Sequence, residues 1–559
     1  MASLSVPQEI ILMLCKELAA RRDFDTLFQC SLVSTRVASI ALEQLYSIHD
    51  LWWTNNSAKG KLDWSRMWKS IILSSIGGTA YPYCIYVNVL SIGGLEACLI
   101  YIDRHKNIRD FFFDGPMGRF LLMQKGHQPT ETPLPLLNST AIANKCADAI
   151  TVYIKRQAGN IPSAQALEHL EGMHFYRHRL PTLAARLSTL VSLHVVDGTT
   201  LSIEAASAIF QFCPKFIDLT CTFYQSSTAD EDLAAFFQML RHNSLQRFQL
   251  LGQNMIGGKA LTSLNAHATS LRILCLFSLS PEAMKAINSL PTCTALEWLQ
   301  IENDPHNQVN LADTESGKSM LKEVRAWICN CKSLQLLQLS HVLNALPIVR
   351  EVLRAPDIRL KSLIVNDFLW EKEEDNTATW DALALQDGLA ALTLGSRQGT
   401  SMGQIIERGS PLAQSICKLK NLRLLNLISS FVMKSAVQSF AEELPRMAEL
   451  SFNGEITDDS ILPSLTIPPE LTLLDIYTLS TFTYQGLHDF GVKLISLGRT
   501  GVRVNIRAQA YESKLQQDEY EALQHLFADE LKGGIWIQYF MVPNPAPDGL
   551  HDRVANLII

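Results

Sequence analysis

Apolar residues recur in a six-residue pattern, L-x-x-L-x-L, through most of the chain after Leu190. Ten clear copies and one weaker copy begin at residues 190, 216, 245, 271, 296, 334, 360, 389, 422, 447 and 471. Because side chains of a β-strand alternate between two faces, apolar residues at every second position predict a strand with one buried face. Segments between the copies, such as SIEAASAIFQFC from Ser202, instead repeat apolar residues at helical spacing. Each unit is therefore predicted to contain a strand, a turn and a helix.

The spacing of the copies resembles that of the leucine-rich-repeat family over roughly residues 166–510. Most steps are 24 to 29 residues long, and the family's repeat takes about 20–29 residues. Two longer steps, of 38 and 33 residues, predict loop insertions. The resemblance implies an α/β solenoid with a parallel sheet inside and helices outside, because one unit alone cannot bury its apolar face. Several unrelated α/β domains are the alternative.

One position of the repeat departs from the family pattern. The usual Asn or Cys, which follows the last apolar position, is replaced by Gly198, Tyr224, Leu279 and Phe368 in four of the copies. Regular repeats use that position for a ladder of side-chain amides that ties successive turns together. Without this ladder, we expect an irregular, unevenly curved solenoid.

The segments before and after the repeats are predicted to extend them. Residues 49–165 are interpreted as a connecting region with the first strand–helix units, including a strand in YCIYVNVLSI from Tyr83 and a Pro-rich loop, QPTETPLPLL. Residues 511–559 contain a helical pattern, DEYEALQHLFADEL, and a strand-like pattern, IWIQYFMV. Because a solenoid needs its last apolar layer covered, these residues are predicted to form a C-terminal cap.

Residues 1–48 are predicted to form three short helices, and the first of them is apolar on nearly every side. In SVPQEIILMLCKEL, from Ser5, the apolar residues leave little of the helical circumference polar. Pro7 suits the start of this helix, where its missing N–H costs nothing, and Asp23 and Ser34 suit the caps of the second and third helices. A single core needs only one apolar face, so the first helix carries surplus apolar surface.

These helices resemble an F-box, a short module with a Pro-x-Glu-Ile opening and a Leu-Val-Ser turn before its third helix. The residues on that pattern are Val6, Pro7, Glu9, Ile10, Leu14, Leu18, Leu27, Cys30, Leu32, Val33, Ser34, Arg36 and Ile40. The match covers about residues 4–48, and Val6 and Gln8 replace the more common Leu and Pro. An F-box ahead of leucine-rich repeats is the order found in F-box receptor proteins, fungal members among them.

The resemblance implies that the module binds a Skp-family linker protein, which joins the receptor to a cullin complex. The residues expected at this contact are Val6, Pro7, Glu9, Ile10, Leu14, Leu32 and Val33. The protein is then expected to be the substrate-recognition subunit of a Skp-cullin-F-box ubiquitin ligase, without catalytic activity of its own. Two alternatives remain open: the helices merely cap the repeats, or the protein is a ligase-independent leucine-rich-repeat scaffold or inhibitor.

A target protein is expected to bind the concave face of the sheet, because residues that alternate with the buried leucines point there. The candidate target-binding residues are Gln249, Phe277, Trp298, Gln300, Leu336, Gln338 and Asn426. Phe277, Trp298 and Leu336 are expected to form one apolar patch ringed by amides, as in protein-binding surfaces with aromatic anchors. The alternative is that loops or the C-terminal tail cover this patch. The predicted strands carry no dense arginine cluster, so phosphate-dependent recognition has no support.

The composition limits the classes of partner and the cellular compartment that we expect for this protein. With 48 Lys and Arg against 55 Asp and Glu, the 559-residue chain has a net charge of −7, which gives no long-range attraction to nucleic acid or to an anionic membrane. The longest apolar stretch, from Tyr81, is broken by Pro82 and Glu96, so no membrane span is expected. The 12 scattered cysteines suit reduced thiols in the cytoplasm or nucleus.

Motif chemistry gives little sign of catalysis. The chain lacks a P-loop, an H-E-x-x-H zinc motif and a dinucleotide fingerprint. Cys329 and Cys331 are close enough for a metal or redox pair, but their place at a helix end favours core packing.

Two charged segments are interpreted as solvated. HFYRHRL from His174 is interpreted as a solvated turn rather than a nucleic-acid contact, and EKEEDNT from Glu371 as a solvated loop. We expect no cofactor and no metal, and an enzyme with a dispersed active site would require a deep pocket of titratable groups with shifted pKa values.

Overall fold

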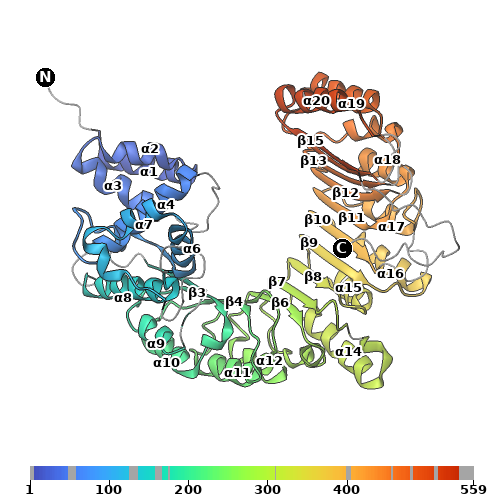
Figure 1. Cartoon of the computed structure of the whole chain (residues 1–559). Helices are drawn as coiled ribbons and strands as arrows, with labels where there is room; N and C mark the ends of the chain where they lie inside the picture. Colours follow the sequence, from blue (N-terminus) through green and yellow to red (C-terminus); the bar gives the residue numbers. More distant parts are fainter. Residues whose placement is uncertain are drawn as a thin grey trace, which may run out of the picture. The chain divides into compact units, whose positions relative to one another are not determined.

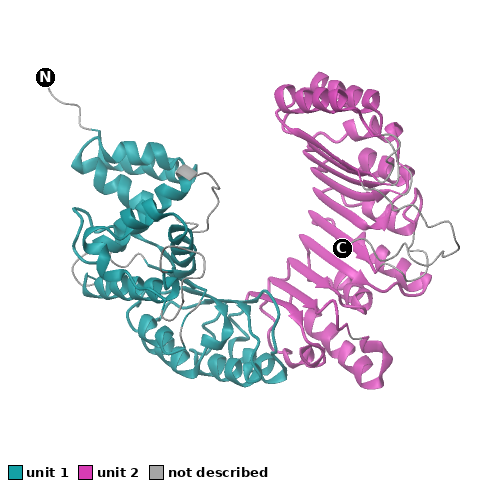
Figure 2. Cartoon of the chain, in the orientation of Figure 1, with its two compact units in different colours: residues 1–271 teal, residues 272–559 magenta. Residues whose placement is uncertain are grey.

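The computed structural model describes residues 6–47, 58–124, 136–157, 167–173, 175, 177–308, 310–397, 405–454, 457–478, 482–508 and 514–539. These residues fall into two compact units, unit 1 within residues 1–271 and unit 2 within residues 272–559 (Figure 2). In each unit the strands are parallel and alternate with helical segments along the chain.

Unit 1 begins with three helices, α1 (Gln8–Ala20), α2 (Phe24–Ser31) and α3 (Thr35–Ser47). The carboxylate of Asp23 accepts the backbone N–H of Thr26 at 3.1 Å, and the Ser34 hydroxyl accepts the backbone N–H of Val37 at 3.3 Å. These side chains satisfy N–H groups that the first turn of a helix leaves without a partner. The three-helix module predicted for the N-terminus is therefore present, and α2 and α3 begin at the predicted caps.

Helices fill most of the segment between this module and the repeats. They are α4 (Ala58–Ser74), α5 (Tyr83–Tyr86), α6 (Ile92–Asp103), α7 (Lys106–Phe112) and α8 (Ser139–Gln157), with strands β1 (Val89–Ser91) and β2 (His169–Gly172). The strand expected from Tyr83 is shorter than predicted, because the chain turns into α5 after Pro82 and the ring of Tyr83 stacks on that of Tyr46 at 4.7 Å. Most of the predicted Pro-rich loop lies outside the described residues.

The remaining repeats of unit 1 add three strands and four α-helices among the described residues. The strands are β3 (Ser192–Asp197), β4 (Asp218–Phe223) and β5 (Arg247–Leu250), and the helices are α9 (Arg179–Ala184), α10 (Ile203–Phe212), α11 (Ala229–Met239) and α12 (Gly258–Ser263). β1 to β5 pair in parallel in chain order. The pairing places Leu170, Leu193, Leu219 and Phe248 in one register row, and all four are buried.

Unit 2 continues the alternation with ten strands among the described residues, each parallel to the next (Figure 1). The strands are β6 (Ile273–Leu279), β7 (Trp298–Asn303), β8 (Leu336–Ser340), β9 (Ser362–Phe368), β10 (Ala391–Ser396), β11 (Leu424–Phe431), β12 (Glu449–Gly454), β13 (Leu473–Thr478), β14 (Arg503–Ala508) and β15 (Gly534–Tyr539). The α-helices are α13 (Pro281–Met284), α14 (Glu315–Cys329), α15 (Ala345–Arg354), α16 (Glu373–Leu383), α17 (Pro411–Cys417), α18 (Lys434–Glu443), α19 (Tyr484–Ser496) and α20 (Gln517–His525).

The apolar positions of the repeat pattern form the core. In β7, Leu299 and Ile301 are buried against the helical side, whereas Trp298 and Gln300 lie on the other face of the sheet. Consecutive helices from α14 to α18 pack against one another on the helical side (Figure 1). All eleven copies of the pattern coincide with strands β3 to β13. The fold is therefore the α/β leucine-rich-repeat solenoid that the sequence predicts, with three helices at its N-terminus.

Apolar packing takes the place of the missing amide ladder. Tyr224, Leu279 and Phe368 occupy the position of the family's Asn or Cys and are buried. Gly198 lies so close to the ring of Tyr224 that an added Cβ would come within 2.5 Å of it. Register shifts interrupt the β6–β7, β9–β10 and β11–β12 pairs. Strand pairing in unit 2 is therefore irregular, in line with the expectation for a solenoid without the ladder.

The prediction of a solvated loop for EKEEDNT was wrong, because these residues lead directly into helix α16. Glu373, Glu374 and Asp375 form the first turn of α16, where negative side chains are favourable beside the helix dipole. Arg350 holds the segment in place through Glu371 at 3.0 Å and Asp375 at 3.4 Å. The acidic run therefore starts a helix and joins it to α15.

The C-terminal elements follow the last copy of the pattern. α20 continues into a π-helical turn at Leu526–Glu530, and β15 pairs in parallel with β14. A helix and a strand are thus present where the sequence indicates them, and the described part of the strand ends at Tyr539. Residues 540–559 lie outside the described residues, so a C-terminal cap over residues 511–559 stays a prediction.

Candidate protein-binding surfaces

Helix α1 buries one of its faces inside the N-terminal module. Cys15 and Ala19 join Leu27 of α2 and Ile40 and Ala41 of α3 in one buried cluster. Partly buried apolar side chains surround this cluster; they are Ile11, Leu12, Leu18, Cys30 and Leu45. Burial, with a smaller effect from the nearby Cys30 thiol, raises the pKa of the Cys15 thiol. The module thus has a small core of its own, and this face of α1 is used in building it.

The opposite side of α1, together with α2 and the turn after it, exposes large apolar side chains. Those at least 37% exposed are Val6, Ile10, Met13, Leu14, Phe24, Phe28, Leu32 and Val33, which we call the outer face. Ile10, Met13 and Leu14 are three and four residues apart and therefore share one side of α1. Phe24 and Phe28 share one side of α2 for the same reason. The first helix thus carries two apolar faces, and one of them is not used for packing within the module.

Every residue that the sequence predicts at a linker contact is exposed. These residues are Val6, Pro7, Glu9, Ile10, Leu14, Leu32 and Val33. Sequence reasoning missed Met13, Phe24 and Phe28, because their exposure depends on how α1 and α2 pack on α3. The spacing of Met13 from Ile10 and of Phe28 from Phe24 was the signal that would have found them. Binding of a linker at these residues stays a prediction.

A row of apolar residues crosses the face of the unit 2 sheet that has no helices. Parallel pairing places Ile273 of β6, Trp298 of β7 and Leu336 of β8 in register, with neighbouring strands about 4.8 Å apart. Trp298 is 44% exposed. Phe277 is not on this row, because it lies four residues after Ile273 on β6, and Ile273 is the residue that pairs with Trp298. Ile273 therefore takes the place that the sequence analysis gave to Phe277.

Amide side chains border this row in unit 2. Gln300 and Gln338 are in register, and Nε2 of Gln300 donates a hydrogen bond to Oε1 of Gln338 at 3.0 Å. Asn426 lies three strands beyond Gln338, and its Oδ1 accepts a backbone N–H of its own strand at 3.1 Å. Gln249 belongs to unit 1, where its Oε1 accepts the Thr220 hydroxyl at 3.2 Å. Trp298, Leu336 and the two glutamines thus form a close group, and target binding there stays a prediction.

Sequence reasoning missed a cluster of aromatic and arginine side chains on β13 to β15. The guanidinium carbon of Arg507 lies 4.6 Å from the ring centroid of Tyr477 and 5.8 Å from that of Trp536. β14 and β15 escaped the repeat pattern because Gly501 and Lys532 occupy their first apolar position. The alternation of apolar residues in VRVNIRA, from residue 502, was the signal that would have found β14.

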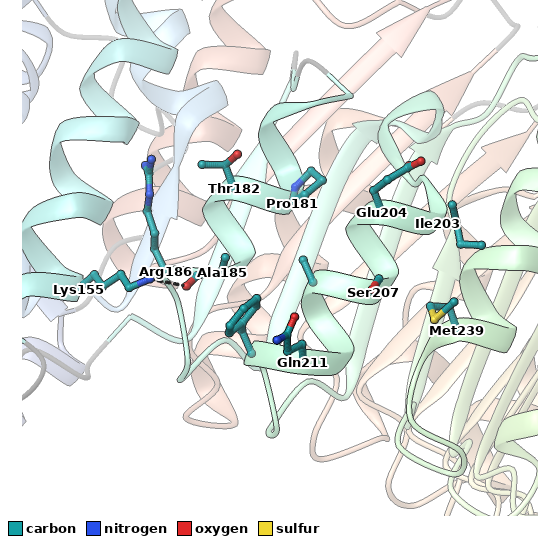
Figure 3. Close-up of a pocket in the computed structure, with 12 residues that line it drawn as sticks. Lys155, Pro181, Thr182, Ala185, Arg186, Ile203, Glu204, Ser207, Gln211 and Met239 are labelled. Carbon is teal, nitrogen blue, oxygen red and sulfur yellow. Dashed lines mark hydrogen bonds between the residues drawn. The ribbon is translucent and has the colours of Figure 1, made fainter.

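An open hollow lies on the helical side of unit 1, lined by residues of α8 to α11 (Figure 3). Nζ of Lys155 donates to the backbone oxygen of Ala185 at 3.2 Å, and Nη1 of Arg186 donates to Oδ1 of Asp148 at 2.9 Å. Burial lowers the pKa of Arg186. Both cations of the hollow are therefore engaged in holding the surrounding helices together.

The Cys329 and Cys331 thiols lie in and beside the packed core of unit 2. Cys331 is fully buried, its Sγ lies 3.6 Å from the carbonyl oxygen of Cys293, and burial raises its pKa to about 12. Burial also raises the pKa of Cys329 at the end of α14. Thiols with raised pKa values form little thiolate, the form that binds metals and attacks disulfides. Throughout the described part of the chain, no three His, Cys, Asp or Glu side chains gather as a metal site.

The basic segment from His174 makes ion pairs within unit 1. Arg177 lies 3.6 Å from the carboxylate of Asp232, and Arg179 pairs with Asp148. These arginines therefore meet carboxylates of their own chain. His174 and Tyr176 of the same segment lie outside the described residues.

Two further features concern membranes and nucleophiles. None of the described helices combines the length and the apolar character needed to cross a bilayer.

The sequence contains one G-x-S-x-G string, at residues 399–403, of the kind found at the nucleophile elbow of many hydrolases. The whole of this string lies outside the described residues.

Comparison with known proteins gives little beyond the fold. No protein-family model matches the chain, and no curated protein matches it. One similar solved structure is the complex of Rad7 and Elc1 in yeast, with 14% identity and a TM-score of 0.35 over 67% of this chain and 89% of that chain. Another is the TLR13–ssRNA13 complex, with 12% identity and a TM-score of 0.27 over 64% of this chain and 59% of that chain. Likenesses this low carry no argument about function.

Proposed function

We propose that this protein is the substrate-recognition subunit of a Skp-cullin-F-box ubiquitin ligase. The outer face carries the proposal, because eight large apolar side chains are exposed within residues 6–33, beside a core that is already complete. Exposed apolar residues that share one side of a helix, as Ile10, Met13 and Leu14 do on α1, are typical of protein-binding sites. The F-box-like residues of the outer face, Ile10, Leu14 and Leu32, support a Skp-family linker as the partner.

The outer face has enough apolar surface to offset a large part of the cost of binding a partner. Full burial of one large apolar side chain contributes roughly 1.5–3 kcal/mol, whereas association costs about 4–15 kcal/mol in lost translational and rotational freedom. The eight side chains of the outer face are about half exposed on average, so each would gain about half of that contribution. Burial of the whole face therefore offsets a large part of the cost, and polar contacts at its rim supply the rest.

The repeats supply the second surface that such a subunit needs. The row of Ile273, Trp298 and Leu336, bordered by Gln300 and Gln338, combines an exposed aromatic anchor with amides. Protein-binding surfaces combine these same features. In this proposal the chain performs no chemistry, needs no cofactor, acts in the cytoplasm or nucleus, and places a target protein beside the cullin complex.

A ligase-independent protein-binding scaffold is the second candidate. The apolar row in unit 2 favours it, because that row requires no linker in order to bind a target. In a scaffold, the outer face would bind either nothing or a protein unrelated to the Skp family. The two candidates therefore differ in what the N-terminal module binds.

Co-purification of the full-length chain with a Skp-family protein tests the proposal. The wild-type chain is expected to retain the linker through size-exclusion chromatography, and Ile10→Asp together with Leu14→Asp is expected to abolish retention, because the new carboxylates would be buried without partners. Leu497→Asp is the matched control, since Leu497 is 46% exposed in unit 2. Absence of linker binding by the wild-type chain, or equal binding by the Ile10/Leu14 variant, would contradict the proposal and favour the scaffold.

A further inference from the structure

Three neighbouring strands of unit 2 bring arginine and aromatic side chains together on the helix-free face. Parallel pairing places Tyr477 of β13 in register with Arg507 of β14, and Asn505 of β14 in register with Trp536 of β15. Trp536 is 42% exposed. Because side chains on one face of a strand are two residues apart, Arg503, Asn505 and Arg507 point to the same face. We call Tyr477, Arg503, Arg507 and Trp536 the arginine cluster.

The two rings position the guanidinium group of Arg507 without using its hydrogen-bond donors. The guanidinium carbon lies 4.6 Å from the centroid of Tyr477 and 5.8 Å from that of Trp536, both within cation–π range. Within the described ranges, no hydrogen bond or ion pair engages the side chain of either Arg507 or Arg503. The five N–H donors of Arg507 are thus held near two aromatic rings and remain available to an acceptor.

A carboxylate suits these donors better than a polyanion does. Guanidinium and carboxylate groups match each other in a bidentate pair. The Asp475 carboxylate lies beside the cluster, where its Oδ1 accepts a hydrogen bond from Asn505 at 2.5 Å, and its charge opposes a nucleic-acid backbone. The net charge of −7 opposes such a polyanion as well. A peptide with a single acidic side chain next to an apolar one meets both Arg507 and the exposed ring of Trp536.

We propose that the arginine cluster is a binding site for an acidic peptide segment of a partner protein. Arg507 receives an Asp or Glu carboxylate, Arg503 adds a second positive charge four residues earlier on β14, and Trp536 covers an apolar side chain next to the acid. The inference rests on the proposed function in one respect, namely that the repeats bind a protein. It places a specific contact on strands that the repeat pattern did not include.

Selection from a phage-displayed library of random 12-residue peptides tests the site. The full-length chain is expected to enrich peptides with Asp or Glu next to a large apolar residue, and Arg507→Met is expected to lose this enrichment, because Met keeps an apolar stem without the charge. An enriched peptide, labelled with fluorescein, is then expected to bind Arg507→Met at least about tenfold more weakly in fluorescence polarisation. Arg354→Met is the matched control, since Arg354 is an exposed arginine at the end of α15.

A second variant keeps the test independent of folding defects. Gln538 is exposed and in register with Arg507, so Gln538→Glu places a carboxylate of the chain itself beside the guanidinium. This variant is expected to compete with the labelled peptide and weaken its binding several-fold. Binding that is unchanged in both variants, or absent from the wild type, would overturn the inference. Tighter binding of a phosphoserine peptide or a single-stranded oligonucleotide than of the acidic peptide would overturn the choice of a carboxylate.

These outcomes are separate from those of the linker experiment. Loss of linker binding in the Ile10/Leu14 variant leaves peptide binding at β13 to β15 unchanged, because the two sets of residues lie in different units. Failure of peptide binding likewise leaves the linker result intact. The proposed function and the site at the arginine cluster therefore fail or succeed independently.

Discussion

Leu14 and Cys15 are neighbours in α1 and lie in opposite environments, with Leu14 59% exposed and Cys15 only 2% exposed. Successive residues of a helix point about 100° apart, so the boundary between the two apolar faces of α1 runs between them. A helix that packs on one core normally places polar residues on its other side. The Leu14–Cys15 pair thus separates the face with which the module folds from the face that we assign to another protein.

Substitutions on the two sides of this boundary are expected to differ in their effect on stability. Leu14→Ser should change the free energy of local unfolding by less than about 0.5 kcal/mol, because the Leu14 side chain is exposed and packs little against the core. Leu27→Ala should cost about 2–5 kcal/mol, because Leu27 is fully buried in the cluster around Cys15. Native-state hydrogen exchange of the amides in α1 to α3 measures both changes. Equal costs would show that the outer face is part of the fold.

His267 in unit 1 gives the fold a dependence on pH. Its side chain is fully buried, its Nδ1 accepts the backbone N–H of Leu245 at 3.4 Å, and its Nε2 lies 3.2 Å from the carbonyl oxygen of Phe237. These contacts suit the neutral ring, with the proton on Nε2. Burial lowers the pKa of His267 to about 4. As the pH falls, the folded state therefore takes up the second ring proton, which makes His267 positively charged, at a lower pH than the unfolded state does.

Unit 1 is consequently expected to lose stability on acidification. The folded-state pKa of His267 lies below the usual value of about 6.5, so its contribution is complete above about pH 6.5 and falls between there and about pH 4. The slope from this group approaches about 1.4 kcal/mol per pH unit. Urea unfolding at pH 7 and pH 5 measures the loss, and His267→Gln should show a smaller difference between the two. An equal difference in the variant would assign the pH dependence to other groups.

Trp298→Ala is expected to separate binding from folding on the sheet of unit 2. Because Trp298 is 44% exposed, its removal should lower stability by no more than about 1 kcal/mol, yet loss of an interface anchor costs about 2 kcal/mol or more in binding. Quantitative mass spectrometry of proteins bound to the chain, with the proteasome inhibited, should show the same set reduced at least about tenfold. Ile467→Ala, at a position 51% exposed, is the control. An unchanged set would remove Trp298 from the target contact.

The sequence predicted the repeats well because a strand with one buried face must alternate apolar residues. Leu299 and Ile301 in β7 follow that rule, and every strand from β3 to β13 contains a copy of the pattern. β14 was not predicted, and β15 was predicted only as a strand of the C-terminal segment and not as a repeat copy, because Gly501 and Lys532 break the first position of their copies. The aromatic and arginine residues on these strands were missed for that reason.

Two other differences have local physical causes. Phe277 was placed by counting alternate residues, which gives the face of the sheet but not the register between strands, and the pairing puts Ile273, four residues earlier on β6, opposite Trp298. The run from Glu371 reads as a solvated loop from its charge alone, whereas carboxylates in a first turn also favour a helix. For the N-terminal module, the sequence correctly predicted that α1 leaves apolar surface exposed, since a helix with two apolar faces can bury only one of them in a single core.

Hydrogen exchange with a linker present tests most directly whether the outer face is a docking surface. Amide exchange of the full-length chain is measured by mass spectrometry with and without a saturating, purified Skp-family protein. We expect slower exchange in residues 6–33 of the wild-type chain and no such slowing in the Ile10→Asp, Leu14→Asp variant. Exchange in residues 6–33 that stays unchanged with the linker present would contradict the assignment of the outer face as a docking surface.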